Sequence, residues 1–375
     1  MKPLEGYFVL DFTQYLAGPS ASLRLADLGA EVVKVEQPGG DSARRMYTSK
    51  LRMDGENSLF HAVNRNKRGI SLNLKSEEDR EKLIPLLKWA DVVLLNYRPG
   101  VAERLGLSYD QVRSVHPGIV YGEITGYGYE GPWAQRPGQD LLVQAVSGMC
   151  MANGNREQLP TPIGLSAADM VAGQHLVQGV MAGLLKAKRT GESVRVQVSL
   201  LESMMDLQFE GFTTFLNDGH ETPRRSGVSN ANLYTSAPYG IYATKDGYIA
   251  MAMTPIPQLG ELIGCQALTR YTDPASWSNQ RDEIKGILAE HLRTQTTGYW
   301  LEILQPKDIW CSDVYTWDEL MKSEAFQALN MVQKVKLQSG KVMETLRCPI
   351  TIDHEHFVSE RPAPHIGQDQ ELYLR

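Results

Sequence analysis

The chain has 375 residues, of which 42% are hydrophobic and 22% are charged, and its formal net charge is −6 at pH 7. This is an ordinary globular composition with room for one large core and a second, smaller one. The negative charge argues against general attraction to nucleic acid or to an acidic membrane surface, so any phosphate site must be a local cluster of Lys and Arg.

Cysteine spacing and the lengths of the apolar runs exclude further classes of protein. The four cysteines are scattered, without a CxxC pair and without His at metal-ligand spacing, so we expect reduced core thiols and no metal site. We find neither a signal-peptide pattern nor an apolar run of about 20 residues, the length that spans a bilayer. We therefore expect a soluble, cytoplasmic protein.

The N-terminal half alternates between strand and helix patterns. Strands are expected at 7–13, 31–36, 70–74, 91–96 and 119–124. Helices are expected at 20–28, from Ser76, and from the region of Asp169 toward Leu185. Short apolar strands followed by helices predict an open parallel α/β sheet, covered on both faces. Ligands of such folds bind beyond the carboxyl ends of the strands, so the loops after Thr13, Leu74, Asn96 and Ile124 should line the site.

The pattern changes near Leu216. Residues 217–238 are rich in Gly, Pro, Ser, Asn and Arg, which is typical of a linker. Residues 239–253 alternate like a hairpin turning at Asp246-Gly247, and helical patterns follow from 282 to 305. We expect a large α/β domain built from residues 1–215 and 325–375, a smaller α/β domain at 225–320, and linkers near 216–225 and 320–330.

The first strand-to-helix loop tests for a dinucleotide site. Glu36 ends the second strand as the ribose-binding acid of such sites does, but the loop reads Leu16-Ala17-Gly18-Pro19-Ser20 and not GxGxxG. One Gly next to a Pro cannot supply the close backbone approach that a pyrophosphate needs. The loop therefore argues against a nicotinamide enzyme.

Basic residues gather at the predicted strand ends. Lys67, Arg68 and Lys75 flank the third strand, while Arg98 and Arg104 follow the fourth. Each taken singly is typical of a solvated surface charge. Together, at the ligand-facing edge of an acidic protein, they indicate a ligand that carries phosphate.

Two acids stand at predicted helix starts. Asp169 lies among small residues in Gly164-Leu165-Ser166-Ala167-Ala168-Asp169, where an acid commonly serves only as an N-cap or first-turn residue. The same position would keep its carboxylate ionised through backbone N–H groups and the helix dipole, and thus available as a nucleophile. Asp140 is a second N-cap candidate, which we interpret as structural because no His neighbour completes an acid–base pair.

The chain resembles the family III CoA-transferases, which include formyl-CoA and carnitine CoA-transferases and are related to the α-methylacyl-CoA racemases. An ordered series of motifs over almost the whole chain carries the resemblance. It comprises Leu10-Asp11-Phe12-Thr13, Gly18-Pro19, residues 28–36, Pro38-Gly39, residues 66–75, Asn96-Tyr97-Arg98-Pro99-Gly100, Gly126-Tyr127-Gly128, Asp140, Gln144-Ala145, Ser147-Gly148, Asp169 and Asp246-Gly247-Tyr248.

The resemblance implies an acyl-CoA:carboxylate CoA-transferase, an enzyme that transfers a sulfur-containing group, with Asp169 as the catalytic carboxylate. Asp169 would form a mixed anhydride with the acyl group and then an aspartyl-CoA thioester. CoA would be a substrate rather than a tightly bound cofactor. The implied CoA contacts are Leu16, Ala17, Gln37, Leu72, Asn73, Leu74, Lys75, Asn96, Tyr97, Arg98, Arg104, Arg136, Pro137, Gly138 and Gln139, with Asp140 as a candidate supporting residue.

The resemblance also implies a Rossmann-like large domain and a ring-shaped subunit interlocked with a second copy in a homodimer. Three departures from the family pattern matter. Racemases carry a His where this chain has Gln139, and Gln cannot exchange a proton near neutral pH, which favours a transferase over a racemase or epimerase. Residues 253–258 contain two prolines where the oxalate branch has a glycine-rich loop, and Gln37 stands where some relatives have Arg.

The substrates are left open by the sequence. A catalytically silent CoA-binding protein is a further alternative, against which the retained Asp169 argues. The donor and acceptor acids cannot be named, and a second carboxylate of a dicarboxylic substrate could meet one of four arginines that are otherwise ordinary loop charges. These are Arg44, Arg45, Arg224 and Arg225.

Overall fold

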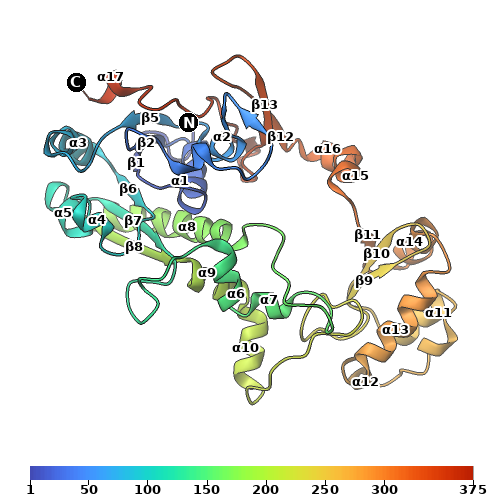
Figure 1. Ribbon diagram of the computed structural model, residues 1–375. Helices are drawn as coiled ribbons and strands as arrows, with labels where there is room; N and C mark the ends of the chain where they lie inside the picture. The colour runs from blue at the N-terminus through green and yellow to red at the C-terminus, as the bar shows by residue number, and fades with distance from the viewer. Residues whose placement is uncertain (375) are drawn as a thin grey trace. The chain divides into compact units, whose positions relative to one another are not determined.

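The computed structural model describes residues 1–374, which divide into two compact units. Unit 1 contains residues 1–143, 166–207 and those from 328 onward, and unit 2 contains residues 144–165 and 208–327 (Figure 1). The domain division predicted from the sequence stays a proposal. It differs from these units in assigning residues 144–165 to the large domain. The predicted ring shape and interlocked dimer also stay proposals.

Unit 1 is built around a six-stranded sheet in which every neighbouring pair is parallel. Its order is β5-β2-β1-β6-β7-β8, as the strands follow one another in Figure 1. The strands are β1 (Phe8–Asp11), β2 (Glu31–Glu36), β5 (Arg68–Ser71), β6 (Val92–Leu95), β7 (Val120–Thr125) and β8 (Val194–Ser199). Since all strands are parallel, their carboxyl ends share one edge, and the strand order reverses between β1 and β6.

Helices cover both faces of this sheet. The unit 1 helices are α1 (Ala17–Asp27), α2 (Ser58–Asn64), α3 (Glu77–Trp89), α4 (Val101–Arg104), α5 (Tyr109–Val115), α8 (Ala167–Thr190), α9 (Leu200–Leu207) and α17 (Gln370–Tyr373). Leu83 and Leu87 of α3 and Val112 of α5 pack with inward-facing strand residues in one core cluster. On the other face, a Cβ on Gly122 of β7 would lie 3.0 Å from Leu176 of α8, so glycine there lets α8 pack closely. The predicted open parallel α/β fold is confirmed.

Small hairpins and a few short helical segments complete unit 1. Its antiparallel pairs are β3 (Arg52–Met53) with β4 (Glu56–Asn57), β12 (Val332–Lys336) with β13 (Val342–Leu346), and β14 (Thr351–Ile352) with β15 (Glu355–His356). A 3-10 helix covers Ser42–Arg45. Helices α6 (Asp140–Val146) and α16 (Glu324–Leu329) each begin in one unit and end in the other.

Unit 2 contains a three-stranded antiparallel sheet in the order β11-β10-β9. Its strands are β9 (Gly240–Ala243), β10 (Tyr248–Met251) and β11 (Cys311–Asp313). Its helices are α7 (Met149–Ala152), α10 (Phe209–Asn217), α11 (Ile256–Leu262), α12 (Pro274–Asn279), α13 (Arg281–Leu292), α14 (Thr297–Leu304) and α15 (Trp317–Lys322), with 3-10 turns at Gln266–Leu268 and Gln305–Lys307. The hairpin predicted at 239–253 is confirmed, and its turn is anchored where Asp246 accepts the Thr297 N–H at 2.8 Å.

Sequence patterns missed part of the architecture. Strand β8 was not expected, because it lies at the sheet edge and alternates partly buried and exposed residues instead of forming an apolar run. The β12–β13 hairpin was also not expected, because the C-terminal segment that contains it shows no clear strand pattern in the sequence. Strand β5 begins and ends earlier than predicted, so Leu72–Lys75 lie in the loop beyond its carboxyl end. Among the helices of residues 1–374, none is long and apolar enough to cross a membrane.

Candidate active site

Two loops meet at the point where the strand order reverses. Asn96, directly after β6, accepts the Gln14 N–H at 2.8 Å through Oδ1 and donates to the Gln14 carbonyl at 2.6 Å through Nδ2. The side chain of Asn96, a predicted CoA contact, is thus engaged in bracing the loop that follows β1. That loop leads directly into Leu16 and Ala17, which begin α1.

A buried network of charged side chains also holds the loop that follows β1. Asp11, the last residue of β1, accepts hydrogen bonds from Thr13 N, Ser22 Oγ and Lys67 Nζ. Lys34 donates to the Thr13 carbonyl at 2.8 Å. Although burial by itself would raise it, the charges of Lys67 and Lys34 hold the pKa of Asp11 below its ordinary value.

The network overturns part of the predicted phosphate cluster. Lys67 is fully buried, and its Nζ lies 3.0 Å from Asp11 Oδ2 and 2.9 Å from Asn64 Oδ1. Burial lowers the pKa of Lys67 to about 8. Arg68 starts β5 at the opposite edge of the sheet and pairs with Asp369 at 2.9 Å. The prediction that these two residues face a ligand is wrong, because both compensate acids of the fold.

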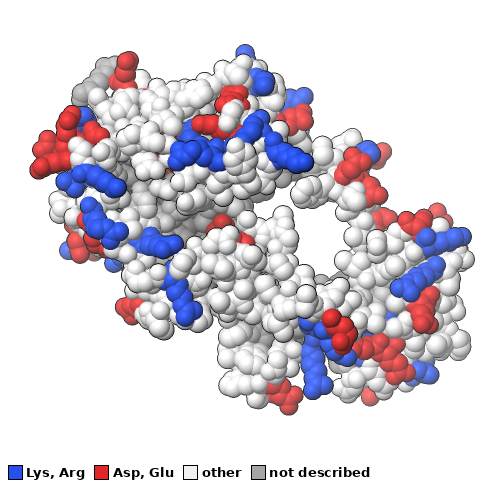
Figure 2. Space-filling view, in the orientation of Figure 1, with Lys and Arg blue, Asp and Glu red and all other residues white. Residues whose placement is uncertain are grey.

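Other predicted contacts are exposed and lie in the segments that follow β2, β5, β6 and β7. They are Gln37, Asn73, Lys75, Arg98, Arg104, Arg136, Pro137, Gly138 and Gln139. Leu72 and Leu74 alternate with these and are buried in the core, so only their backbone groups are open to a ligand. Figure 2 shows the Lys and Arg side chains in separate groups, several of them beside acidic side chains, rather than in one continuous basic face.

Segment 126–139 folds back over the end of β7. A Cβ on Gly126 would lie 2.5 Å from the Cα of Gly138, so the two glycines touch through their backbones. This close approach requires glycine at both positions. It brings Arg136–Gln139 to the carboxyl edge of the sheet and leads the chain into α6.

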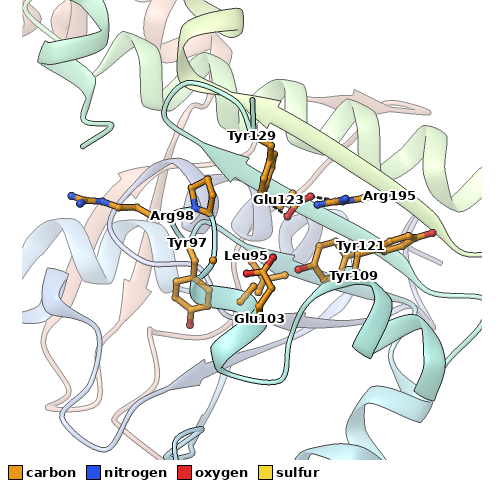
Figure 3. Close-up of a pocket in the computed structure, with 12 residues that line it drawn as sticks. Leu95, Tyr97, Arg98, Glu103, Tyr109, Tyr121, Glu123, Tyr129 and Arg195 are labelled. Atoms are coloured by element: carbon orange, nitrogen blue, oxygen red, sulfur yellow. Dashed lines mark hydrogen bonds and ion pairs between the residues drawn. The ribbon is translucent and has the colours of Figure 1, made fainter. Parts of the chain in front are cut away.

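A small pocket lies beside the loop after β6 (Figure 3). At its floor, the buried Glu123 of β7 accepts Arg195 Nε of β8 at 2.7 Å and a hydrogen bond from the Tyr129 hydroxyl. Arg195 lies 5.6 Å from the ring centre of Tyr109. Figure 3 shows Arg98 extending away from this ion pair. The pocket was missed by the sequence reading, although a charged residue such as Glu123 inside an apolar strand signals a buried partner.

Asp169 is the third residue of α8 and lies next to the start of α1. One turn further along α8, a Cβ on Gly173 would come within 2.8 Å of the Ala17 carbonyl and 2.4 Å of Ser20 Oγ. Helices α1 and α8 therefore pack with their backbones almost in contact. Because Asp169 precedes Gly173 by about one turn, this packing brings the turn that carries Asp169 near the start of α1.

The electrostatics of Asp169 differ from the expectation. Burial first, and then the negative charge of Asp140, raise the pKa of Asp169 to about 7. The expected stabilisation by the helix N-terminus does not reach Asp169, because Asp140 Oδ1 accepts the N–H groups of Ala168 at 2.8 Å and of Asp169 at 3.2 Å. At neutral pH such a carboxyl group exists in both forms, and its ionised form is more basic than an ordinary carboxylate.

Two of the arginines considered for a second substrate carboxylate are already engaged. Arg44 is buried and donates to Glu36 and Glu56. Arg225 is buried and donates to three backbone carbonyls, those of Asn153, Arg156 and Gln158. Arg45 and Arg224 are exposed. In the described chain, no group of three or more His, Cys, Asp or Glu is arranged to hold a metal ion.

Comparison with known proteins gives a consistent result. The model of CoA-transferase family III matches residues 4–370. A probable fatty acyl-CoA transferase of Mycobacterium tuberculosis is 32% identical over 100% of this chain and 98% of its own length. A succinate–glutarate CoA-transferase of Agrobacterium fabrum is 30% identical over 99% and 95%, and an acetyl-CoA:oxalate CoA-transferase of Acetobacter aceti is 30% identical over 100% and 95%.

Solved structures agree over the whole fold. The orthorhombic crystal form of the Mycobacterium tuberculosis protein Rv3272 has a TM-score of 0.86 at 31% identity and covers 100% of this chain and 99% of its own. A CAIB/BAIF family protein from Brucella suis has a TM-score of 0.85 at 28% identity over 99% and 98%. The resemblance drawn from the motifs is confirmed. The chain belongs to CoA-transferase family III and is a CoA-transferase, an enzyme that uses acyl-CoA and moves CoA between carboxylic acids.

Proposed function

We propose that this enzyme transfers CoA by acylating Asp169. The observation that carries the proposal is the position of Asp169 in the first turn of α8, packed beside the loop at the strand-order reversal, with its pKa raised to about 7. Ligands of open α/β sheets bind at this kind of position. A basic carboxylate is the nucleophile that thioester exchange between acids requires.

The proposed exchange takes place in four acyl transfers. An Oδ of Asp169 attacks the thioester carbonyl. A C–O bond forms, the C–S bond breaks, and the CoA thiolate departs, so that Asp169 and the acyl group form a mixed anhydride. The thiolate attacks the Asp169 carbonyl and releases the donor acid as its carboxylate. The acceptor carboxylate then attacks the aspartyl-CoA thioester, and the thiolate released attacks the new acyl carbonyl. Asp169 is regenerated, and neither net proton nor electron is consumed.

The CoA site that we propose uses the carboxyl edge around this acid. Lys75, Arg98, Arg104 and Arg136 offer exposed cations to the phosphates, in the forms that bind phosphate best. Leu16 would contribute apolar contact, and Ala17, Leu72 and Leu74 would contribute backbone groups. The remaining proposed contacts are Gln37, Asn73, Asn96, Tyr97, Pro137, Gly138 and Gln139.

A direct test of these contacts measures CoA affinity by titration calorimetry. Arg98→Ala and Arg104→Ala should each weaken binding by about tenfold, the effect of losing one charge-assisted hydrogen bond. Arg293→Ala removes an exposed arginine of unit 2 and serves as the matched control. Equal affinity of all three variants and the unchanged protein would remove these two arginines from the site.

Racemisation is the less supported alternative. It needs a second base beside Asp169, and this chain has Gln139 immediately before Asp140, where an amide cannot take up a proton near neutral pH. Incubation of an α-branched acyl-CoA in deuterated water, without an acceptor acid, separates the two reactions. We expect no deuterium at the α-carbon.

The acid substrates are best approached experimentally. The printed names of the relatives include glutarate and oxalate transferases and a fatty acyl-CoA transferase, so family membership does not select one class. With Arg44 and Arg225 engaged inside the fold, only the exposed Arg45 and Arg224 remain of the four arginines considered for a dicarboxylate. A panel of mono- and dicarboxylic acids with acetyl-CoA and succinyl-CoA would identify the acceptor.

We also propose that the subunit is ring-shaped and forms an interlocked homodimer. Large apolar side chains are exposed in unit 1 at Met181 and Leu185 of α8 and Leu207 of α9, and in unit 2 at Phe209 and Phe212 of α10. Apolar surface of this kind is commonly covered in an assembly. Sedimentation velocity should give the mass of two chains, and a monomer that is fully active would contradict this part of the proposal.

Covalent labelling tests the central claim. After incubation with acyl-CoA and quenching, mass spectrometry should find an adduct on the peptide that carries Asp169, removable by hydroxylamine. Asp169→Ala should abolish both the adduct and exchange, while Asp318→Asn, a change at an exposed acid of α15, should leave both intact. Full exchange activity in Asp169→Ala would refute the proposal.

A further inference from the structure

Helix α8 receives its N-terminal cap from a different helix. Its own N-cap residue, Ser166, makes no capping hydrogen bond through its side chain. Asp140, the first residue of α6, takes this role instead: its Oδ1 accepts the N–H of Ala168 at 2.8 Å and that of Asp169 at 3.2 Å. These are the second and third residues of α8, whose N–H groups an N-cap side chain normally satisfies.

The cap holds a second carboxyl group close to Asp169. Asp140 is 7% exposed, so solvent screens its charge poorly. Its Oδ1 is the acceptor for two N–H groups at the start of α8. The donors that would stabilise an ionised Asp169 are thereby taken, and a negative charge stands beside it.

We propose that Asp140 is a positioning residue whose fixed negative charge keeps Asp169 a more basic and more nucleophilic carboxylate than the start of a helix would otherwise produce. This inference deepens the proposed function and rests on it. It requires that no other charged group on the helices and strands packed against α8 acts on Asp169 as strongly as Asp140.

Those other groups are distant from Asp169 or are compensated. Helix α1, which packs on α8, has its charged side chains, Arg24 and Asp27, in its last turns. On β7, Glu123 is paired with Arg195. Helix α9 carries Glu202, which accepts from Ser199, and Asp206, which lies 3.2 Å from His175 almost two turns along α8. Burial and Asp140 are the two causes that raise the pKa of Asp169.

The arrangement favours acylation. When Asp169 attacks the thioester, its charge passes to the departing CoA thiolate and the acylated side chain is neutral. Repulsion between the two acids is therefore present before the bond forms and absent in the mixed anhydride and the aspartyl thioester. The relief of this repulsion offsets part of the free-energy cost of breaking the thioester. It can do so because the repulsion acts in the ground state and is absent in the intermediate.

Asp140→Asn isolates the charge, because the amide oxygen can still accept both N–H groups. The carboxyl titration of Asp169 is followed in the full-length protein without substrate, by infrared or carbon NMR spectra of carboxyl-labelled Asp, and assigned by comparison with Asp169→Asn. We expect the midpoint to fall by about one pH unit or more when the neighbouring charge is removed. Asp140→Glu, which keeps the charge, should retain a higher midpoint than Asp140→Asn.

The activity profile gives a second readout. In Asp140→Asn the acidic limb of kcat/KM should move down with the titration. With the Brønsted slope of about 0.4–0.5 known for thiolates, a midpoint lower by about one unit should reduce kcat well above pH 7 by about threefold. A purely structural cap would change thermal stability without moving either midpoint. An unchanged Asp169 midpoint in Asp140→Asn overturns the inference, and Asp140→Ser, with a hydroxyl acceptor, gives the same test if the first variant does not fold.

The two proposals can fail separately. A lowered midpoint together with an enzyme that is never labelled at Asp169 would support the electrostatic coupling and refute covalent transfer. Labelling at Asp169 with an unchanged midpoint would support the transfer and refute the role of Asp140.

Discussion

Two acids of unit 1, the fully buried Asp11 and the partly buried Asp169, lie near the same edge of the same sheet and have opposite surroundings. Asp11, at the end of β1, is met by Lys67, Lys34 and two hydroxyl groups, and its pKa is held below the ordinary value against the effect of burial. Asp169, at the start of α8, has a second acid for its charged neighbour, and its pKa is raised to about 7. Burial acts in the same direction on both groups.

The difference therefore lies in the partner. Compensated by two lysines, Asp11 ties β1 to the loop that follows and serves as a brace. Burial and the charge of Asp140 leave Asp169 poorly stabilised as an anion, which supports the role of nucleophile that we propose for it. A buried carboxylate thus indicates a functional site only when the surrounding charges leave it uncompensated, and this can be tested by changing each acid or its partner.

The largest expected effect is on activity. Asp169→Asn keeps the size of the side chain and removes the nucleophile, so exchange should fall by at least about a thousandfold, as for other covalent catalysts. Because an uncompensated charge is removed, thermal stability should stay the same or rise. Exchange assays and thermal melts of the same preparation check both parts. Loss of stability in parallel with activity would mean that Asp169 is a brace like Asp11.

The next effect is on stability. Lys67→Met should destabilise the fold by about 3 kcal/mol or more, because it leaves Asp11 buried with a single lysine nearby. Lys75→Met, at an exposed lysine of the next loop, should change the free energy of unfolding by less than about 0.5 kcal/mol and weaken CoA binding instead. Urea denaturation and CoA titration separate the two lysines. Equal stability of both variants would show that the Asp11 network is not a brace.

Lys67 and Lys75 show which features could be predicted from the sequence and which could not. The parallel sheet and the bounds of β2 could be predicted, because apolar runs report burial along the chain. The predicted loops do form the carboxyl edge. Small neighbours and a helix start made Asp169 a candidate, while its catalytic role was implied by the family resemblance and stays a proposal. Whether Lys67 faces a ligand depends on Asp11, 56 residues away, and a local pattern carries no information on that pairing.

The same limit applies to the acids of the site. Asp140 and Asp169 could each be recognised as a helix-start acid, but that Asp140 caps the helix of Asp169, 29 residues on, follows only from the packing. The expected stabilisation of Asp169 by its own helix was wrong for this reason. Strand β8 escaped because an edge strand buries little. In each case the missing information is a contact between distant parts of the chain.

A smaller effect is expected from the packing that positions Asp169. Gly173→Ala would place a methyl group 2.8 Å from the Ala17 carbonyl, which is backbone and cannot turn away. Helices α1 and α8 must then separate slightly, at a cost of about 1–3 kcal/mol. The acid would move away from the loop beside it, so kcat should fall more than CoA affinity. Gly286→Ala, in unit 2 where a Cβ meets open space, is the matched control. Unchanged kcat in a destabilised Gly173→Ala would show that the spacing of these helices does not set the reaction geometry.

The smallest effect concerns how stability depends on pH, and it has opposite signs for the two acids. The pKa of Asp169 is higher in the folded chain than its ordinary value of 3.8, so folding takes up a proton between about pH 4 and pH 7 and the contribution to stability is lost as pH rises through that range. The pKa of Asp11 is lowered, so its contribution is present above the ordinary value and is lost as pH falls.

Asp169→Asn should therefore gain stability relative to the unchanged protein between pH 5 and about pH 8, as urea denaturation at several pH values can measure. Because the raised pKa depends partly on Asp140, the gain should shrink when both proteins also carry Asp140→Asn. If Asp169→Asn gains the same stability in the Asp140→Asn background, the raised pKa of Asp169 is due to burial alone. Asp140 and Asp169 would then not be coupled, and the contrast with Asp11 would lose its basis.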